Sequence, residues 1–268
     1  MQLENSGKIT IISINRTKKR ISLLLSDGEE IDVNEDIILD HYLFVNKELN
    51  KVEIKEIKEN ADMSGALNYS YKLLSKGMYT EKEIKTKLEQ RKYSFKIIRN
   101  VLTKLLKLNY LNDARYVEEF VSSSKCKGYG PNKIINTLKS KGISDKLLAS
   151  IEYNEDEQKD IIKLKIPKLS KQYNKYSLKN KKIHIVNSLV SAGFDTSIIY
   201  NMIDEYLTYD AENEKMILSR DAKRIYEKLQ KKSLSAYELR QSVVSYLLRK
   251  GYNYNDIDGA LREIDYED

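Results

Sequence analysis

Hydrophobic and polar residues alternate along the first part of the chain. Apolar side chains occupy every second position in three short runs: Ile12 and Ile14; Ile21, Leu23 and Leu25; and Ile31 and Val33. A period of two is typical of half-buried strands, and Asp27–Gly28 between the second and third runs is a strong hairpin turn signal. A hairpin alone is marginally stable in water. We therefore expect residues 1–60 to form a small β-rich module that packs against another part of the chain, with 52–57 as either a further strand or the start of a helix.

From about residue 61 the pattern becomes helical, and it repeats. Four segments share a leucine, an apolar residue five positions later and then an amphipathic run; they are 85–105, 135–153, 186–206 and 244–264. Their leucines are Leu88, Leu138, Leu189 and Leu247, which are 50, 51 and 58 residues apart. A period near 50 residues with helical content predicts about three helices per repeat. Repeats of this size bury a continuous core by stacking on their neighbours.

A glycine precedes the apolar residue in three of the four segments, at Gly142, Gly193 and Gly251. Glycine adopts at little cost the left-handed conformation that ends many helices, so we expect a helix to end at each position. Lys92 replaces the glycine in the first segment, which predicts a turn that is strained or built differently. Pro167 lies in the first helix of the third repeat and predicts a kink or a stop near Ile166.

The predicted fold is mostly α: tandem three-helix repeats, forming a helical-repeat solenoid, with a small N-terminal β-rich module. The module occupies 1–60, and the repeats are placed at 61–110, 111–154, 155–210 and 211–268. Two prolines and ten glycines in 268 residues are too few turn residues for an all-β sandwich or barrel. Because contacts in a solenoid are mainly between neighbouring repeats, we expect an elongated molecule.

The positive charge of the chain is concentrated in one segment. The net charge is +7, and residues 159–182 hold nine lysines and one acidic residue, a local charge of +8 that leaves about −1 for the rest. Lysines at this density neutralise phosphates, and tyrosines stack on bases. The alternative is a solvated helix face on which the lysine stems cover apolar surface. The candidate contact residues of this segment are Lys171, Lys175, Lys179, Lys182, Tyr173 and Tyr176.

A second candidate region is the turn Gly128–Tyr129–Gly130–Pro131. A glycine-rich turn that opens a helix can bind phosphate through backbone N–H groups, and Lys125, Lys127 and Lys133 surround this one. No strand is expected before the turn, and Pro131 removes one donor, so a tight turn between helices is the alternative interpretation.

The sequence carries no recognisable catalytic, cofactor or metal motif. HExxH, GxSxG and P-loop sequences are absent, and the single cysteine allows neither an internal disulfide nor a cysteine-based zinc site. We interpret His184 as a packed or half-exposed side chain. We expect a protein that is not an enzyme and that needs no cofactor or metal, although an enzyme acting on phosphates at the glycine turn is a third class. No apolar run approaches the roughly 18 residues of a membrane span and no signal peptide is recognisable, so we expect a cytoplasmic protein without membrane contact.

One stretch also points to a family. Residues 108–144 read LNYLNDARYVEEFVSSSKCKGYGPNKIINTLKSKGIS and resemble the centre of the RecX family, bacterial regulators of the RecA recombinase. The matching residues are Tyr110, Leu111, Asn112, Asp113, Tyr116, Val117, Phe120, Lys127, Gly128, Gly130, Ile134, Leu138, Lys141, Gly142 and Ile143. Residues 66–88 resemble the first repeat of that family, and 8–33 resemble its N-terminal β extension. The chain departs from the family pattern in having only Lys76 where arginines are usual, and Asn132 at one usually basic position.

The resemblance implies a non-enzymatic regulator in DNA repair, recombination and the SOS response. Members bind in the groove of the RecA–DNA filament, bridge neighbouring subunits and inhibit strand exchange and co-protease activity. The expected partners are therefore a recombinase filament and single-stranded DNA, directly or through the filament, and we expect a monomer. The alternative from the residues themselves is a helical protein that binds single-stranded DNA independently of a recombinase.

Overall fold

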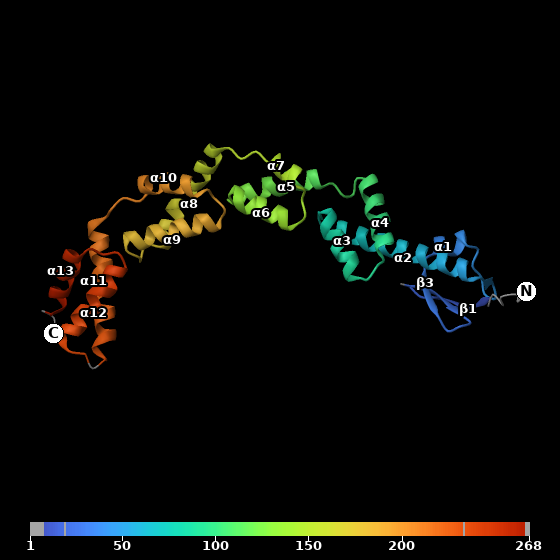
Figure 1. Ribbon diagram of the computed structural model, residues 1–268, viewed down its shortest axis with the longest axis horizontal. Helices are drawn as coiled ribbons and strands as arrows, with labels where there is room; N and C mark the ends of the chain where they lie inside the picture. The colour runs from blue at the N-terminus through green and yellow to red at the C-terminus, as the bar shows by residue number, and fades with distance from the viewer. Residues whose placement is uncertain (1–7, 19, 233, 266–268) are drawn as a thin grey trace, which may run out of the picture. The chain divides into compact units, whose positions relative to one another are not determined.

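The chain is largely helical after a short β region, as the computed structural model in Figure 1 shows. The structure describes residues 8–18, 20–232 and 234–265, which hold thirteen helices and a four-stranded sheet. This confirms the predicted fold class. The described residues form two compact units: one contains those up to Glu119 together with Lys139–Leu147, and the other contains Phe120–Leu138 and those from Leu148 onward.

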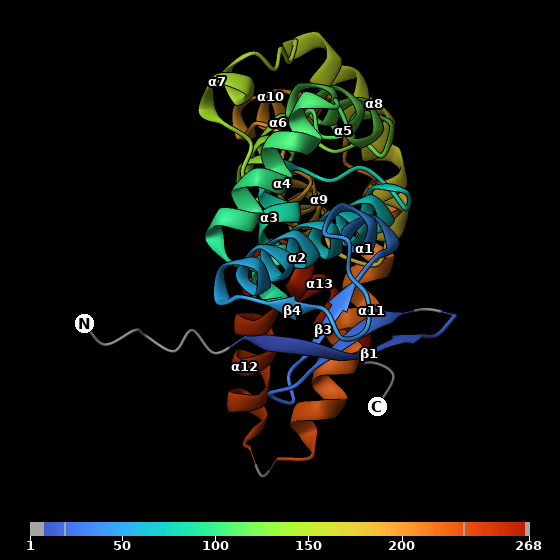
Figure 2. The same cartoon turned by 90° about the vertical axis from the view of Figure 1, so that its right-hand side faces the viewer.

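The β region is an antiparallel sheet in the order β3-β2-β1-β4. Its strands are β1 (Ile9–Arg16), β2 (Ile21–Leu25), β3 (Glu30–Val33) and β4 (Glu48–Leu49). The hairpin predicted at Asp27–Gly28 is confirmed, because Gly28 has a φ of +87° and its N–H donates to the carbonyl of Leu25 at 3.0 Å. In Figure 2 the sheet lies below α1 (Glu35–Asp40) and α2 (Lys51–Leu74).

The alternation expected in the first strand is interrupted. The pattern placed Ile12 on the same face as Ile14, but Ile12 is 52% exposed and its neighbour Ile11 is fully buried. The cause is a register shift in the pairing of β1 with β2, where Ile11 faces Leu25 and Ser13 faces Leu24. An extra residue in one strand reverses which side chains point inward.

Residues 52–57 begin a helix, which decides between the two alternatives left open by the sequence. Asn50 caps α2 in a capping box with Glu53. Ile54 and Ile57 of this helix pack in the core of the sheet, whereas Ala66 and Leu67 pack in the next core along the chain. One continuous helix thus joins the β module to the first helical repeat. The numerical boundaries of the module and the repeats stay predictions.

The later helices follow as triplets. They are α3 (Glu81–Gln90), α4 (Phe95–Lys107), α5 (Asp113–Cys126), α6 (Pro131–Ser140), α7 (Asp145–Ala149), α8 (Glu155–Gln172), α9 (Leu178–Ser191), α10 (Thr196–Tyr206), α11 (Ala211–Gln230), α12 (Ala236–Arg249) and α13 (Tyr254–Asp265). Separate hydrophobic cores form within α2–α4, α8–α10 and α11–α13. Each core is built from apolar residues at helical spacing on three helices, as the period near 50 residues predicts.

Helix α8 does not end near Ile166. It continues through Pro167 to Gln172, so the expected stop is wrong. Proline removes the amide donor for the carbonyl of Lys163. The helix is nevertheless held by its apolar face, because Ile162 and Ile166 are almost fully buried in the core that contains Phe194.

One contact recurs between the second helices of successive triplets. In the first case, the Thr80 hydroxyl at the start of α3 donates to the carbonyl of Lys141, just after α6, at 2.8 Å. In the second, the N–H groups of Gly130 and Asn132 at the start of α6 donate to the carbonyls of Ala192 and Gly193, after α9, at 2.7 and 3.0 Å.

The third case joins α9 to α12. The Ser177 hydroxyl at the start of α9 donates to the carbonyl of Lys250, after α12, at 2.6 Å. We call each of these three contacts a helix-end junction. The last carbonyls of a helix and its first N–H groups have no partners within the helix. Each junction gives carbonyls at one helix end a donor from another helix, and it brings a positive dipole end to a negative one.

The junction explains why glycine ends three of the four second helices. Gly193 and Gly251 have φ values of +91° and +89°. A Cβ on Gly193 would lie 2.3 Å from the backbone nitrogen of Lys133, and one on Gly251 would lie 2.4 Å from Cδ of Lys179. Glycine is therefore required both by the turn and by the helix that docks on it.

Lys92 follows the end of α3, the second helix of the first triplet, and among the described residues no earlier second helix precedes it to dock on this turn. Its φ is +61°, and its N–H donates to the carbonyl of Glu89 at 2.8 Å. The turn is therefore built as the glycine turns are, with a lysine in the left-handed conformation. This is the strained alternative of the two that the sequence left open, and it costs about 1–2 kcal/mol.

Gly193→Ala should destabilise the protein more than Gly251→Ala. Both substitutions place a side chain at a left-handed position, at a cost of about 1–2 kcal/mol. At Gly193 the new methyl also meets the backbone of Lys133, so at least two junction hydrogen bonds are lost, at about 1 kcal/mol each. At Gly251 it meets the stem of a lysine, which can move more easily. The free energy of unfolding of both variants, measured with urea, checks this; equal losses would contradict it.

Candidate nucleic-acid interface

The four lysines predicted as contacts in residues 159–182 differ in their surroundings. Lys171 and Lys175 are exposed near the end of α8. The stem of Lys179 covers Gly251 in the third helix-end junction, and the ammonium of Lys182 pairs with Asp204 at 2.5 Å. Two of the four therefore support the fold directly, and their contact with a partner stays a prediction.

Tyr173 and Tyr176 pack around His184. The ring of His184 lies 5.1 Å from that of Tyr173 and 4.4 Å from that of Tyr176, centroid to centroid. The Tyr173 hydroxyl is also 3.0 Å from Oγ of Ser188. The half-buried setting of His184 confirms its interpretation as a packed side chain. Both tyrosines already contact a protein ring, so less of their ring surface is free to stack on bases. Their stacking on bases stays a prediction.

The glycine turn before α6 is a junction between helices. The N–H groups of Gly130 and Asn132 are occupied by the carbonyls described above, and the carbonyl of Tyr129 accepts the hydroxyl of Tyr153 at 2.7 Å. Of the two interpretations left open by the sequence, this favours the tight turn over a backbone cradle for phosphate. Any anion at this place must be bound by side chains.

Lysine side chains do gather at this turn. The stem of Lys165, from α8, packs against Gly128. Burial lowers the pKa of Lys165, and the charges of Lys168 and Lys133 lower it further. We call Lys133, Lys165 and Lys168 the lysine cluster. Mutual repulsion of three ammonium groups is relieved when an anion binds between them, so this is the surface best suited to phosphate.

The lysine cluster joins the two regions that the sequence predicted separately. Lys133 belongs to the glycine turn, and the other two belong to the lysine-rich segment. The sequence did not single out Lys165 and Lys168 as contact residues, because only the packing of α8 beside the turn distinguishes them from the neighbouring lysines. Lys127 is exposed next to the turn. Lys125 pairs with Glu157 at 2.5 Å and lies over the ring of Tyr153.

Several residues of the family motif build the first helix-end junction. Gly142 forms the turn on which the stem of Lys82 packs, and the ammonium of Lys141 pairs with Glu83 at 2.5 Å. Tyr116 is buried with the Lys141 ammonium 5.5 Å from its ring centre. The carboxylate of Asp113 accepts the N–H of Glu81 at 3.1 Å. These motif residues thus stabilise the fold.

Two further motif residues lie at the link between α4 and α5. Leu111 is buried there, whereas Tyr110 is 56% exposed. Phe120, in α5, is half-buried.

The ion pair between Glu83 and Lys141 makes the first junction sensitive to acid. Burial alone would raise the pKa of Glu83, but the Lys141 ammonium and the Thr80 hydrogen bonds outweigh it and leave the pKa below 4.5. A carboxyl whose pKa is lowered by folding stabilises the folded state fully above its unfolded pKa, and loses that effect as pH falls through the folded value.

Glu83→Gln should therefore lower the free energy of unfolding by about 1 kcal/mol at pH 7, and the difference from the wild type should vanish as pH falls below about 4. Glutamine keeps the capping hydrogen bonds, so the change isolates the ion pair. Glu238→Gln, in the capping box of α12, is the matched control and should have a smaller effect. A difference between wild type and Glu83→Gln that stays constant from pH 7 to pH 3 would contradict this assignment.

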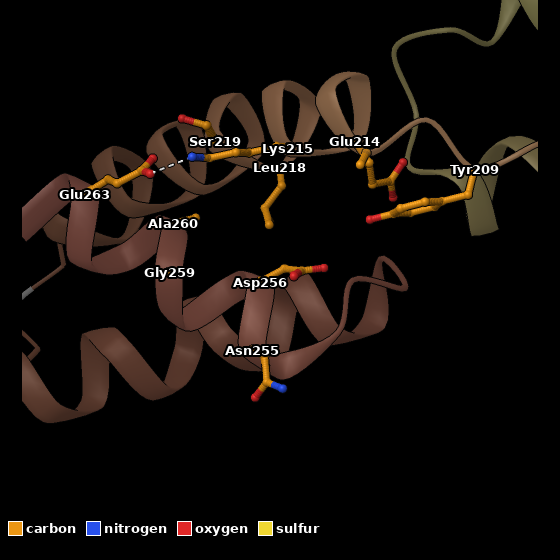
Figure 3. A pocket seen from close by; sticks show the side chains of 11 residues that line it. Tyr209, Glu214, Lys215, Leu218, Ser219, Asn255, Asp256, Gly259, Ala260 and Glu263 are labelled. Atoms are coloured by element: carbon orange, nitrogen blue, oxygen red, sulfur yellow. Dashed lines mark ion pairs between the residues drawn. The ribbon is translucent and has the colours of Figure 1, made fainter.

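A cavity of about 320 Å³ lies between α11 and α13 (Figure 3). Lys215 and Glu263 pair at 2.9 Å at one end of it, and Tyr209 and Glu214 lie at the other. Burial raises the pKa of Glu214, and the carboxylate of Asp256 contributes to this. With three carboxylates and one ammonium, this cavity does not suit phosphate, and the predicted contact lysines do not line it.

Within residues 8–18, 20–232 and 234–265, no three His, Cys, Asp or Glu side chains are grouped so as to hold a metal ion. In the same part of the chain, no helix combines the length and the apolar character needed to cross a bilayer.

The fold and the junctions define a protein of tandem three-helix repeats, and comparisons identify its family. The model of the first three-helix domain of RecX matches residues 66–105, and that of the second matches residues 112–150. The regulatory protein RecX of Streptococcus agalactiae serotype V is 33% identical over 256 residues, which are 94% of this chain and 98% of the relative. RecX of Lactococcus lactis subsp. cremoris SK11 is 31% identical over 264 residues, covering 96% and 98%.

A solved structure shares the fold. A crystal structure described as regulatory protein RecX aligns with a TM-score of 0.55 at 24% identity, covering 73% of this chain and 98% of that one. Taken with the relatives, the chain belongs to the RecX family of regulatory proteins.

Proposed function

We propose that this chain binds the RecA–DNA filament and inhibits the recombinase without itself being an enzyme. Membership of the RecX family supports a regulatory role. The observation that carries the proposal is the lysine cluster, which places positive charge beside a helix-end junction. Repeats joined by like junctions offer several contact surfaces on one chain, and several weak contacts together give strong binding.

The proposed mechanism is contact with the filament. Lys133, Lys165 and Lys168 neutralise DNA phosphates exposed along the filament, and apolar and polar faces of the repeats contact recombinase subunits. A monomer in the cytoplasm suffices, because each chain carries several repeats. Inhibition follows from holding neighbouring subunits in one arrangement during strand exchange.

The direct test adds the protein to filaments of the cognate recombinase on single-stranded DNA. We expect strand exchange and ATP hydrolysis to fall as the protein is titrated, and the recombinase to be captured by the immobilised protein more strongly with DNA than without it. Full activity at saturating protein would contradict the proposal.

The lysine cluster can be tested by replacing Lys133, Lys165 and Lys168 with glutamine. Each phosphate contact on a single strand contributes about 0.7 to the slope of log affinity against log salt, so the slope should fall by about 2. Lys51, Lys55 and Lys231, which are exposed elsewhere, are replaced in the control and should leave the slope nearly unchanged. An equal decrease of the salt slope in both variants would show that binding depends on net charge and not on the lysine cluster.

A second candidate function is single-strand binding independent of a recombinase, and the same lysine cluster favours it. The two functions differ in one measurable way. If naked single strands and filaments are bound with equal affinity and equal salt slope, and the recombinase is not captured, the second function is correct.

A further inference from the structure

A second cavity, in the other compact unit, has the chemistry of a nucleotide site. It lies at the link between α4 and α5, beside the turn after α2, and has a volume of about 510 Å³. The residues that line it include Lys76, Asn109, Tyr110, Asn112 and Arg115. From these residues we propose that this cavity binds one nucleotide of single-stranded DNA, with the base stacked on Tyr110 and the phosphate at Lys76 and Arg115.

Tyr110 is an exposed aromatic ring that is held in place. The ring is 56% exposed, and its position is fixed by an edge-to-face contact with Tyr71 at 5.3 Å between centroids. The preceding residue, Asn109, has a φ of +57°, and the N–H of Tyr110 donates to the carbonyl of Leu105 at 2.9 Å. A fixed ring loses little freedom when a base stacks on it, and every base has a face that can stack.

The charges of this cavity distinguish it from the others. Among the described residues that line it, Lys76 and Arg115 are charged and both are positive. The cavity between α11 and α13 has three carboxylates and one ammonium in its lining, and the one beside the β module has Asp32 and Glu35 as well as Lys18 and Arg20. A cavity with two cations therefore favours a phosphate.

Hydrogen-bonding groups complete the site. Asn109 and Asn112 also line the cavity. Nδ2 of Asn112 donates to Oδ1 of Asn109 at 3.2 Å, and Oδ1 of Asn112 accepts the N–H of Arg115 at 3.0 Å. Both residues are exposed. Side-chain amides can donate to and accept from the edge of a base. A stacking ring and two cations are the groups that single-strand binding sites combine, and the amides add hydrogen-bonding groups beside them.

This proposal deepens the second candidate function, single-strand binding independent of a recombinase, by naming where one base and its phosphate are held. It is also separate from the lysine cluster, which binds phosphates and contributes no ring.

The first experiment uses the full chain and a thymine oligonucleotide that carries one 5-iodouracil. After irradiation, mass spectrometry should find the cross-link on Tyr110. Cross-links at Tyr173 or Tyr176 with Tyr110 unmodified, or no binding of the oligonucleotide, would overturn the proposal.

Variants test the ring and the cations independently. Tyr110→Ala should weaken binding of the oligonucleotide about 5- to 150-fold, the range for loss of one stacked base. Tyr110→Phe keeps the ring and should bind almost as the wild type does. Tyr237→Ala removes a tyrosine that is 70% exposed elsewhere and is the control for loss of an exposed ring. Unchanged binding by Tyr110→Ala would overturn the proposal.

The cations are tested by Lys76→Gln with Arg115→Gln. Loss of two phosphate contacts should reduce the salt slope by about 1.4, and an unchanged slope would count against the site. Circular dichroism confirms that each variant is folded. If Tyr110→Ala does not fold, the cross-link on the wild type and the salt slope of the cation variant still test the site. Inhibition of the recombinase without a cross-link to Tyr110 would leave the proposed function standing and remove this site.

Discussion

The carbonyl groups at the end of a helix have no donor within that helix. In this chain they receive donors from another helix, and these helix-end junctions organise its helical part. Three times, the start of one second helix donates to the turn that ends the next. The donors differ: a hydroxyl from Thr80, two backbone N–H groups at Gly130 and Asn132, and a hydroxyl from Ser177. The acceptors are carbonyls at a glycine turn in every case. The acceptor is thus a glycine turn in all three junctions, whereas the donor group differs between them.

The second junction also positions the candidate interface. With its N–H groups occupied by Ala192 and Gly193, the glycine turn before α6 cannot bind an anion through its backbone. The same packing brings Lys165 against Gly128 and places the charges of Lys133 and Lys168 near it. Positive charge that is spread over two regions of the sequence becomes one surface.

Local patterns in the sequence predicted the elements, and longer-range contacts decided the exceptions. The period near 50 residues and the glycines at 142, 193 and 251 located three helix ends. The reason for glycine lies in a helix that precedes each turn by about 60 to 73 residues in sequence, and periodicity does not reveal such a contact. In the same way, the bulge that turns Ile12 outward depends on pairing with β2, and the continuation of α8 past Pro167 depends on the burial of Ile162 and Ile166. The lysine cluster was beyond prediction because charge counting treats all nine lysines of residues 159–182 alike.

Amide hydrogen exchange at the start of α6 tests the central claim most directly. The first N–H groups of a helix normally lack acceptors in the helix and exchange quickly. The helix-end junction predicts that the amides of Gly130 and Asn132 are protected, whereas those of Ala236 and Tyr237, at the exposed start of α12, exchange quickly. Exchange of Gly130 and Asn132 as fast as that of Ala236 and Tyr237 would contradict the account.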